Sequence, residues 1–198
     1  MKYDPEKHHR RSIRLKIYDY AWEGVYFITL CTEGRICIFG EIIDGEMCLN
    51  EIGEIAVVEW EKSQEIRREI ELGEWVIMPN HLHGIVIIRE PTDSESPSPQ
   101  ETGAGRRGGP PSAQEAKQVE PRQMRSQPKS LSSLMQGYKS ATTKRINVAR
   151  QSWGEEVWQR NYFERVIRNQ RELDAIQGYI LDNPRRWAED RENPDRQI

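Results

Sequence analysis

The sequence predicts an α+β domain in which helices pack on a central antiparallel sheet. Segments rich in β-branched and aromatic residues alternate along the chain with segments of helical periodicity. The short connection Pro79-Asn80 separates two strand-like segments, which makes those segments antiparallel neighbours. The second of them is apolar on both sides, so helices are expected on both faces of the sheet.

The first predicted elements are a strand at residues 24–32 and a hairpin at residues 36–50 that turns at Asp44-Gly45. Asn50 is the expected N-cap of the helix that follows the hairpin, because its side chain can accept from free backbone N–H groups. The apolar positions expected on one stripe of that helix are Ile52, Ile55, Ala56, Ile66 and Ile70.

Two strands are then predicted at residues 74–78 and 81–89, on either side of the Pro79-Asn80 break. The last predicted elements are a helix at 130–150, a strand at 162–168 and a helix at 169–184 that is stopped by Pro184. The residues that share the inner face of the 130–150 helix are Leu131, Leu134, Met135 and Tyr138.

Residues 91–128 differ in composition from the rest of the chain. They hold seven of the eleven prolines, several glycines and few large apolar side chains. Such a segment buries too little surface to offset the entropy of ordering it, which predicts a flexible low-complexity insertion. The expected single domain therefore consists of residues 1–90 and 129–198.

No apolar run approaches the roughly 20 residues that a membrane helix needs, and the first residues contain no apolar leader segment. Cys31, Cys37 and Cys48 are odd in number and form no CxxC pair. These features predict a cytoplasmic protein without a membrane partner, with reduced thiols that pack as small hydrophobic side chains.

The net charge of −3 conceals a basic region. Residues 121–154 contain no acidic residue, and local charge decides whether a phosphate backbone is attracted. The bases of this run are Arg122, Arg125, Lys129, Lys139, Lys144, Arg145 and Arg150. A second set follows: Arg160, Arg165, Arg168 and Arg171. A solvated helix face is the alternative interpretation of this pattern.

Two of the four histidines, His81 and His83, begin the predicted 81–89 strand. Side chains at positions i and i+2 of a strand point the same way, so both imidazoles share a face with Ile85 and Ile87. Two imidazole nitrogens at this spacing can bind one divalent cation and leave other coordination positions open. The alternative is a pair of hydrogen-bonded core histidines.

The last helix places Tyr179 at the edge of its apolar stripe, and Asn183 lies one turn further along the same side. A helix packed over the histidine face would bring this phenol and this amide close to a bound metal. A tyrosine hydroxyl can attack a phosphodiester when a nearby cation polarises the phosphate. The alternative is an ordinary half-buried tyrosine.

Several ordered motifs resemble those of one family. The segments "VIMPNHLHGIVI", "VWQRNYFERVIRN" and "YILDNP", together with the opening "RRSIRLKIYDYAWEGVYFITLCTEGR", are similar to the REP-associated tyrosine transposases. These are single-tyrosine HUH transposases, named for a His-hydrophobic-His motif. The resemblance covers residues 10–184 and is interrupted by the insertion, which departs from the compact family pattern.

The resemblance implies a ferredoxin-like sandwich and a metal-dependent enzyme that cleaves and rejoins single-stranded DNA at hairpin-forming repeats. His81 and His83 match the histidines that hold Mg²⁺ or Mn²⁺, and Tyr179 matches the nucleophile that forms a 5′-phosphotyrosine. Asn183 matches a polar metal ligand that is often glutamine in relatives. Family members act as monomers or homodimers.

Six basic residues are candidates for DNA binding: Lys139, Lys144, Arg145, Arg160, Arg165 and Arg168. Interleaved aromatic residues would suit unpaired bases, with core packing as the alternative for Trp158 and Phe163. Tyr138 is a rival nucleophile beside Lys139, although its apolar stripe predicts an inward-facing ring. Two other functions stay open: a domesticated protein that binds hairpins without cutting them, and an unrelated metal hydrolase.

Overall fold

The computed structural model of the chain describes residues 23–89 and 130–196. The predicted insertion at 91–128 lies outside the described residues, as do Arg122, Arg125 and Lys129 of the basic run. The prediction for this segment therefore stays a prediction.

A four-stranded antiparallel sheet forms the centre of the domain, with the strand order β4-β5-β1-β6. Its strands are β1 (Gly24–Cys31), β4 (Ile70–Met78), β5 (His81–Ile88) and β6 (Phe163–Ile167). A separate two-stranded sheet pairs β2 (Gly40–Ile43) with β3 (Glu46–Leu49). The Pro79-Asn80 break joins β4 to β5 as antiparallel neighbours, as the sequence predicted.

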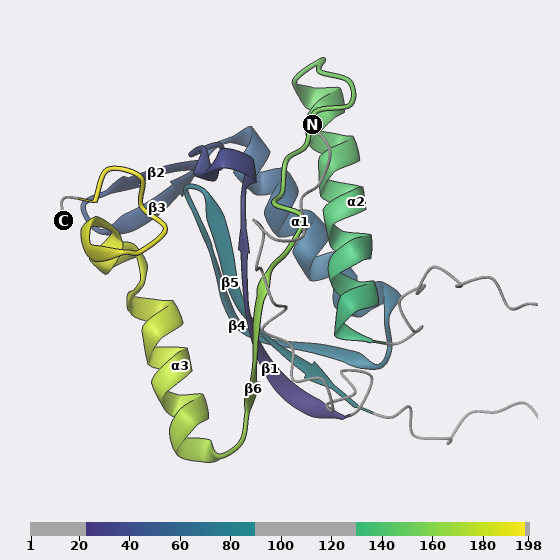
Figure 1. The fold of residues 1–198 in the computed structure, drawn as a ribbon, viewed down its shortest axis with the longest axis vertical. Coiled ribbons are helices and arrows are strands. Elements are labelled where there is room, and N and C mark those ends of the chain that lie inside the picture. Colours follow the sequence, from purple (N-terminus) through teal and green to yellow (C-terminus); the bar gives the residue numbers. More distant parts are fainter. Residues whose placement is uncertain (1–22, 90–129, 197–198) are drawn as a thin grey trace, which may run out of the picture.

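Helices cover both faces of the central sheet (Figure 1). The helices α1 (Glu51–Ile66) and α2 (Leu131–Ala149) lie together on one face, where they enclose the larger core with Tyr26, Ile28 and Leu30 of β1. The helix α3 (Gln170–Asp182) covers the other face over a smaller core. This arrangement confirms the predicted α+β sandwich.

Local sequence signals account for the element boundaries. The Asn50 side chain accepts hydrogen bonds from the N–H groups of Ile52 and Gly53, which confirms it as the N-cap of α1. Asp44 and Gly45 both have positive φ, as the tight turn between β2 and β3 requires. The predicted inner face of α2 is buried along its whole length.

The predicted stripe of α1 is wrong at its end. Ile66 is 77% exposed, and Ile70 belongs to β4, where it pairs with Ile88 and is buried. The chain leaves the helix at Arg67, and Ile70 is buried in the sheet instead of on the helix. The strand β4 therefore begins four residues earlier than predicted.

The three cysteines are free thiols, but Cys37 and Cys48 are exposed, so the prediction that all three pack as small hydrophobic side chains is wrong. Cys37 precedes the small β2–β3 sheet and Cys48 lies within β3, and this sheet has little core of its own to bury them. Among the described helices, none has the length and apolar character needed to cross a membrane.

Candidate active site

The two histidines lie at the start of β5 on the face covered by α3. Both are buried, with 0% and 3% of the side chains of His81 and His83 exposed, and their ring centroids are 4.4 Å apart. His83 pairs with Thr29 and Ile85 pairs with Phe27 across the sheet, so all four side chains share this face. The predicted orientation of the histidine pair is confirmed.

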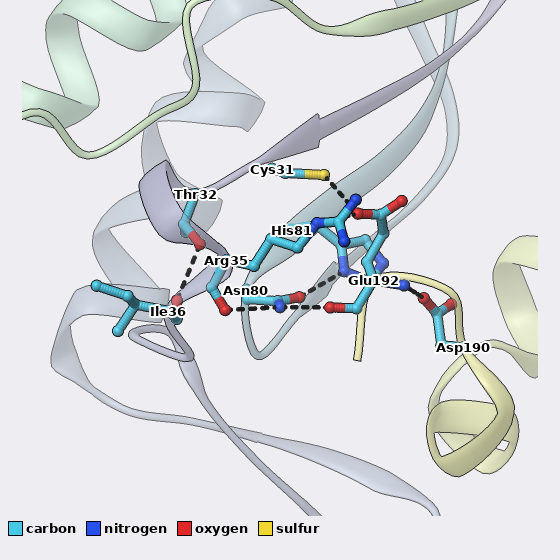
Figure 2. Close-up of polar contacts among 8 residues, drawn as sticks. All are labelled: Cys31, Thr32, Arg35, Ile36, Asn80, His81, Asp190 and Glu192. Carbon is cyan, nitrogen blue, oxygen red and sulfur yellow. Dashed lines mark hydrogen bonds and ion pairs between the residues drawn. The ribbon is translucent and has the colours of Figure 1, made fainter. Parts of the chain in front are cut away.

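The protonation of His81 follows from its neighbour Asn80. The Asn80 Nδ2 group donates to two carbonyl oxygens, those of Arg35 at 3.0 Å and Glu192 at 2.7 Å (Figure 2). The amide oxygen of Asn80 therefore faces His81 Nδ1, 2.8 Å away, and accepts its proton. His81 Nε2 then carries a lone pair, and it has no hydrogen-bond partner within the described part of the chain.

His83 is held at both ring nitrogens. Nδ1 is hydrogen-bonded to Thr29 Oγ1 at 2.8 Å, and Nε2 to Tyr179 Oη at 3.0 Å. The Phe27 ring stacks on the imidazole with a centroid distance of 5.4 Å. A neutral imidazole donates at one nitrogen and accepts at the other, so this ring links the threonine hydroxyl to the phenol.

Tyr179 projects from α3 toward the histidines. Its neighbour Ile180 is fully buried and anchors the helix on the sheet, whereas Tyr179 itself is 41% exposed. Burial raises the pKa of Tyr179 to about 12, and the Asp190 carboxylate adds to this rise. The phenol is therefore protonated at neutral pH unless a positive charge comes close to it.

A carboxylate that the sequence analysis missed completes the site. After α3, the chain returns toward the histidines through the 3-10 turn η2 (Pro184–Glu189). The buried Asp190 follows this turn directly. One potential ligand atom from each of His81, His83 and Asp190 lies within 4.8 Å of the others. The sequence contains one hint of this ligand, a cluster of acidic residues after Pro184. Such a cluster is equally typical of a solvent-exposed C-terminal segment.

Asn183, predicted as a metal ligand, lies beside this carboxylate. Its Nδ2 donates to Asp190 Oδ2 at 3.1 Å, and its Oδ1 is buried without a partner among the residues described here. Asn183 therefore orients Asp190 and still has an oxygen available for a ligand. The backbone N–H of Glu192 donates to the other carboxylate oxygen at 2.6 Å.

The donor set fits a divalent cation. Burial lowers the pKa of His81 to about 3, and burial together with the nearby His81 lowers that of His83 well below its usual range. Both imidazoles are therefore neutral at pH 7, as metal ligands must be. Two neutral nitrogens, one carboxylate and the free Asn183 oxygen together offer a mixed nitrogen and oxygen site.

The six predicted DNA-binding residues fall in different places. Lys144 and Arg145 lie on α2, and Arg145 forms an ion pair with Glu59 of α1 on the side of the sheet away from the histidines. Arg165 pairs with Phe27 across β1 and β6, which puts it on the histidine face, and Arg168 is exposed between β6 and α3.

Lys139 and Arg160 are in direct contact. Lys139 Nζ donates to the backbone carbonyl oxygens of Gln159 at 2.7 Å and Arg160 at 3.0 Å. Burial lowers the pKa of Lys139 to about 8. Its ammonium therefore holds the segment before β6 in place, while the Arg160 side chain stays exposed.

The aromatic residues considered in the sequence analysis also differ in burial. Trp158 packs in the core and donates from Nε1 to Thr142 Oγ1 at 2.7 Å, in agreement with the core-packing alternative. Phe163 is 42% exposed, and its ring contacts Phe27 on the histidine face. Tyr138 is buried and donates to the Ala56 carbonyl at 3.1 Å, so the rival nucleophile is inaccessible to DNA.

Three comparisons show which known proteins the chain is similar to. Residues 124–183 match a family model described as "Transposase IS200 like". An uncharacterized protein of Haemophilus influenzae (strain Rd) is 36% identical over 195 residues, which cover 96% of each chain. A solved REP-associated tyrosine transposase bound to a REP hairpin is similar in fold, with 18% identity and a TM-score of 0.53. That match covers 88% of this chain and 73% of the other.

Proposed function

We propose that the chain, whose residues 124–183 match the IS200-like transposase model, acts as a transposase that cleaves and rejoins single-stranded DNA with Tyr179 as the nucleophile. The observation that carries the proposal is the 3.0 Å contact between Tyr179 Oη and His83 Nε2. This contact supports the proposal because an accessible phenol beside groups that could hold a metal ion suits a tyrosine-based transesterification of a phosphodiester.

We infer that His81, His83 and Asp190 hold a divalent cation, Mg²⁺ or Mn²⁺, with Asn183 Oδ1 as a further ligand. When bound there, the cation would supply charge neutralisation for the scissile phosphate and for the phenolate. The buried histidines and the hydrogen-bonded carboxylate are fixed in position before substrate arrives, so little reorganisation accompanies binding.

The covalent step is an exchange of one ester for another. Tyr179 Oη loses its proton to solvent, which reaches the half-exposed ring, and attacks the phosphorus. The bond from phosphorus to the 3′ oxygen breaks, and that oxygen leaves as a 3′-hydroxyl after taking up a proton. A 5′-phosphotyrosine results, and another 3′-hydroxyl can reverse the step and join the strands without ATP.

The nucleophile and the histidines belong to one chain, which supports activity as a monomer. A single copy carries Tyr179 on α3 and both histidines on β5, and α3 packs directly on β4 and β5. No residue from a second copy is needed to bring these groups together.

The proposed substrate is single-stranded or hairpin DNA. The similar fold of a transposase that binds a REP hairpin supports this partner. On the histidine face, the exposed Phe163 ring suits base stacking. The guanidinium of Arg165 on the same face forms an ion pair with Glu172, which it would exchange for a phosphate. Arg160 and Arg168 are exposed as well and remain candidates for phosphate contacts.

The test is an assay of labelled single-stranded palindromes with Mn²⁺, with EDTA and with the matched linear duplex. A covalent adduct that forms only with Mn²⁺ on single-stranded DNA would support the proposal. Hairpin binding without an adduct would indicate a domesticated binding protein. Hydrolysis of small phosphodiesters without DNA binding would indicate an unrelated metal hydrolase.

A further inference from the structure

We propose that Asn80 is a positioning residue that couples two segments of the metal site, the start of β5 and the C-terminal segment that carries Asp190. This inference rests on the proposed metal-dependent function. It assigns a role to a side chain that is fully buried and hydrogen-bonded to His81, a proposed metal ligand.

One end of the Asn80 amide fixes His81. The Asn80 oxygen accepts from His81 Nδ1 at 2.8 Å, which sets the tautomer and turns Nε2 toward the site. Without this acceptor, the imidazole could place its proton on either nitrogen, and the buried His81 Nε2 would no longer be committed to a ligand.

The other end of the amide holds the segment of Asp190. Asn80 Nδ2 donates to the Glu192 carbonyl at 2.7 Å, and the Glu192 N–H donates to Asp190 Oδ1 at 2.6 Å (Figure 2). The Glu192 side chain adds an ion pair with Arg35 at 2.9 Å and a contact with Cys31 Sγ at 3.5 Å. Asp190 is therefore connected to the β4–β5 turn through a chain of hydrogen bonds.

The turn itself does not depend on the Asn80 side chain. Backbone carbonyl groups form its other contacts: that of Asn80 accepts from Thr32 N, and that of Pro79 accepts from Ile38 N and Phe39 N. The Asn80 side chain can therefore form its hydrogen bonds with the start of β5 and with the C-terminal segment that carries Asp190. Its loss would remove the partner of the buried His81 Nδ1 and of two part-buried carbonyl groups, those of Arg35 and Glu192.

The test measures Mn²⁺ affinity of the full chain by the electron paramagnetic resonance signal of free Mn²⁺, a readout that does not require DNA. We expect Asn80→Ala to weaken Mn²⁺ binding by about 10- to 100-fold, as other outer-shell changes do. Asn147→Ala is the matched control, because Asn147 is a buried asparagine whose partners lie at the end of α2, far from the histidines in the sequence. It should lower the melting temperature and leave Mn²⁺ affinity unchanged.

A double-mutant cycle separates coupling from general destabilisation. If Asn80 acts partly through Asp190, the effect of Asn80→Ala on Mn²⁺ affinity should shrink in an Asp190→Asn background. An equal effect in both backgrounds would overturn the coupling. Should Asn80→Ala fail to fold, Asn80→Ser decides the question. Its hydroxyl keeps a polar group at the turn but is too short to bridge His81 and the Glu192 carbonyl, so we expect an affinity loss of about tenfold.

Failure of the inference and failure of the proposed function give different results. Wild-type protein that binds no Mn²⁺ would overturn both. Wild-type protein that binds Mn²⁺ and loses it with His81→Ala, but not with Asn80→Ala or Asn80→Ser, would overturn the role of Asn80 alone.

Discussion

Tyr179 Oη lies 3.0 Å from His83 Nε2, although the two residues are 96 positions apart in the sequence. The contact exists because α3 packs across β4 and β5 with Ile180 buried beneath it. The Phe27 ring contacts both the phenol and the imidazole from β1. The proposed nucleophile therefore stands beside a candidate ligand atom before any substrate binds.

We expect Tyr179→Phe to abolish the covalent protein–DNA adduct while hairpin binding and Mn²⁺ binding persist. Phenylalanine keeps the packing against Phe27 and removes only the attacking oxygen. Denaturing gel electrophoresis of labelled single-stranded substrate with Mn²⁺ measures the adduct.

Tyr138→Phe is the control for that experiment, because it removes a phenolic oxygen from a buried tyrosine on α2. It should keep the adduct and reduce the free energy of unfolding by about 1 kcal/mol, since only the bond to the Ala56 carbonyl is lost. An adduct that survives Tyr179→Phe and disappears with Tyr138→Phe would reverse the assignment.

Asp190→Asn should weaken Mn²⁺ binding by about tenfold or more and slow adduct formation in proportion, because it removes the negative charge from the proposed ligand set. Isothermal titration calorimetry measures the affinity. Glu189→Gln makes the same change at the preceding residue, an exposed carboxylate paired with Arg186, and should leave the affinity unchanged. Equal effects of both variants would mean that Asp190 contributes only general charge.

Lys139 and Arg160 should respond differently to substitution. Lys139→Met removes two charged hydrogen bonds to the segment before β6 and should lower the free energy of unfolding by about 1–3 kcal/mol. Arg160→Ala should leave the melting temperature unchanged, weaken hairpin binding and reduce the slope of log affinity against log salt by about one. Thermal melts and fluorescence anisotropy at several salt concentrations test both expectations. If Lys139→Met has the same free energy of unfolding as wild type, Lys139 does not stabilise the segment before β6.

Stability in the absence of metal should fall as the pH drops below about 6.5. Burial lowers the pKa of His81 to about 3 from its usual 6.5, so the unfolded chain binds more protons than the folded chain between these values. The free energy of unfolding therefore decreases as pH falls through this window. Thermal melts in EDTA at several pH values should show the decrease, and His81→Gln should make it shallower. A melting temperature that does not change with pH in wild type would contradict the burial of neutral imidazoles.

Most helices and strands could be predicted from the sequence alone. The same holds for the two parts of the site, the histidine strand and the helix that carries Tyr179. The Asn50 cap, the Asp44-Gly45 turn and the alternation of the His81 strand depend on contacts between near neighbours. Such contacts are readable because the backbone geometry of a turn, cap or strand fixes which side chains meet. The spacing of Tyr179 and Asn183 on one side of a helix was readable for the same reason.

Which of these residues come into contact depends on the tertiary structure. The same is true of which expected DNA-binding residues are engaged in contacts within the protein. Asp190 joins the site, and Glu192 meets Asn80, through the return of the chain after α3, which no local pattern encodes. Lys139 was expected to face DNA, yet its ammonium is bound to carbonyl groups twenty residues away in sequence. Contacts of this kind depend on which groups are buried and on which buried polar groups can form hydrogen bonds with one another. Burial and hydrogen-bond pairing are both defined only once the helices and strands have packed together.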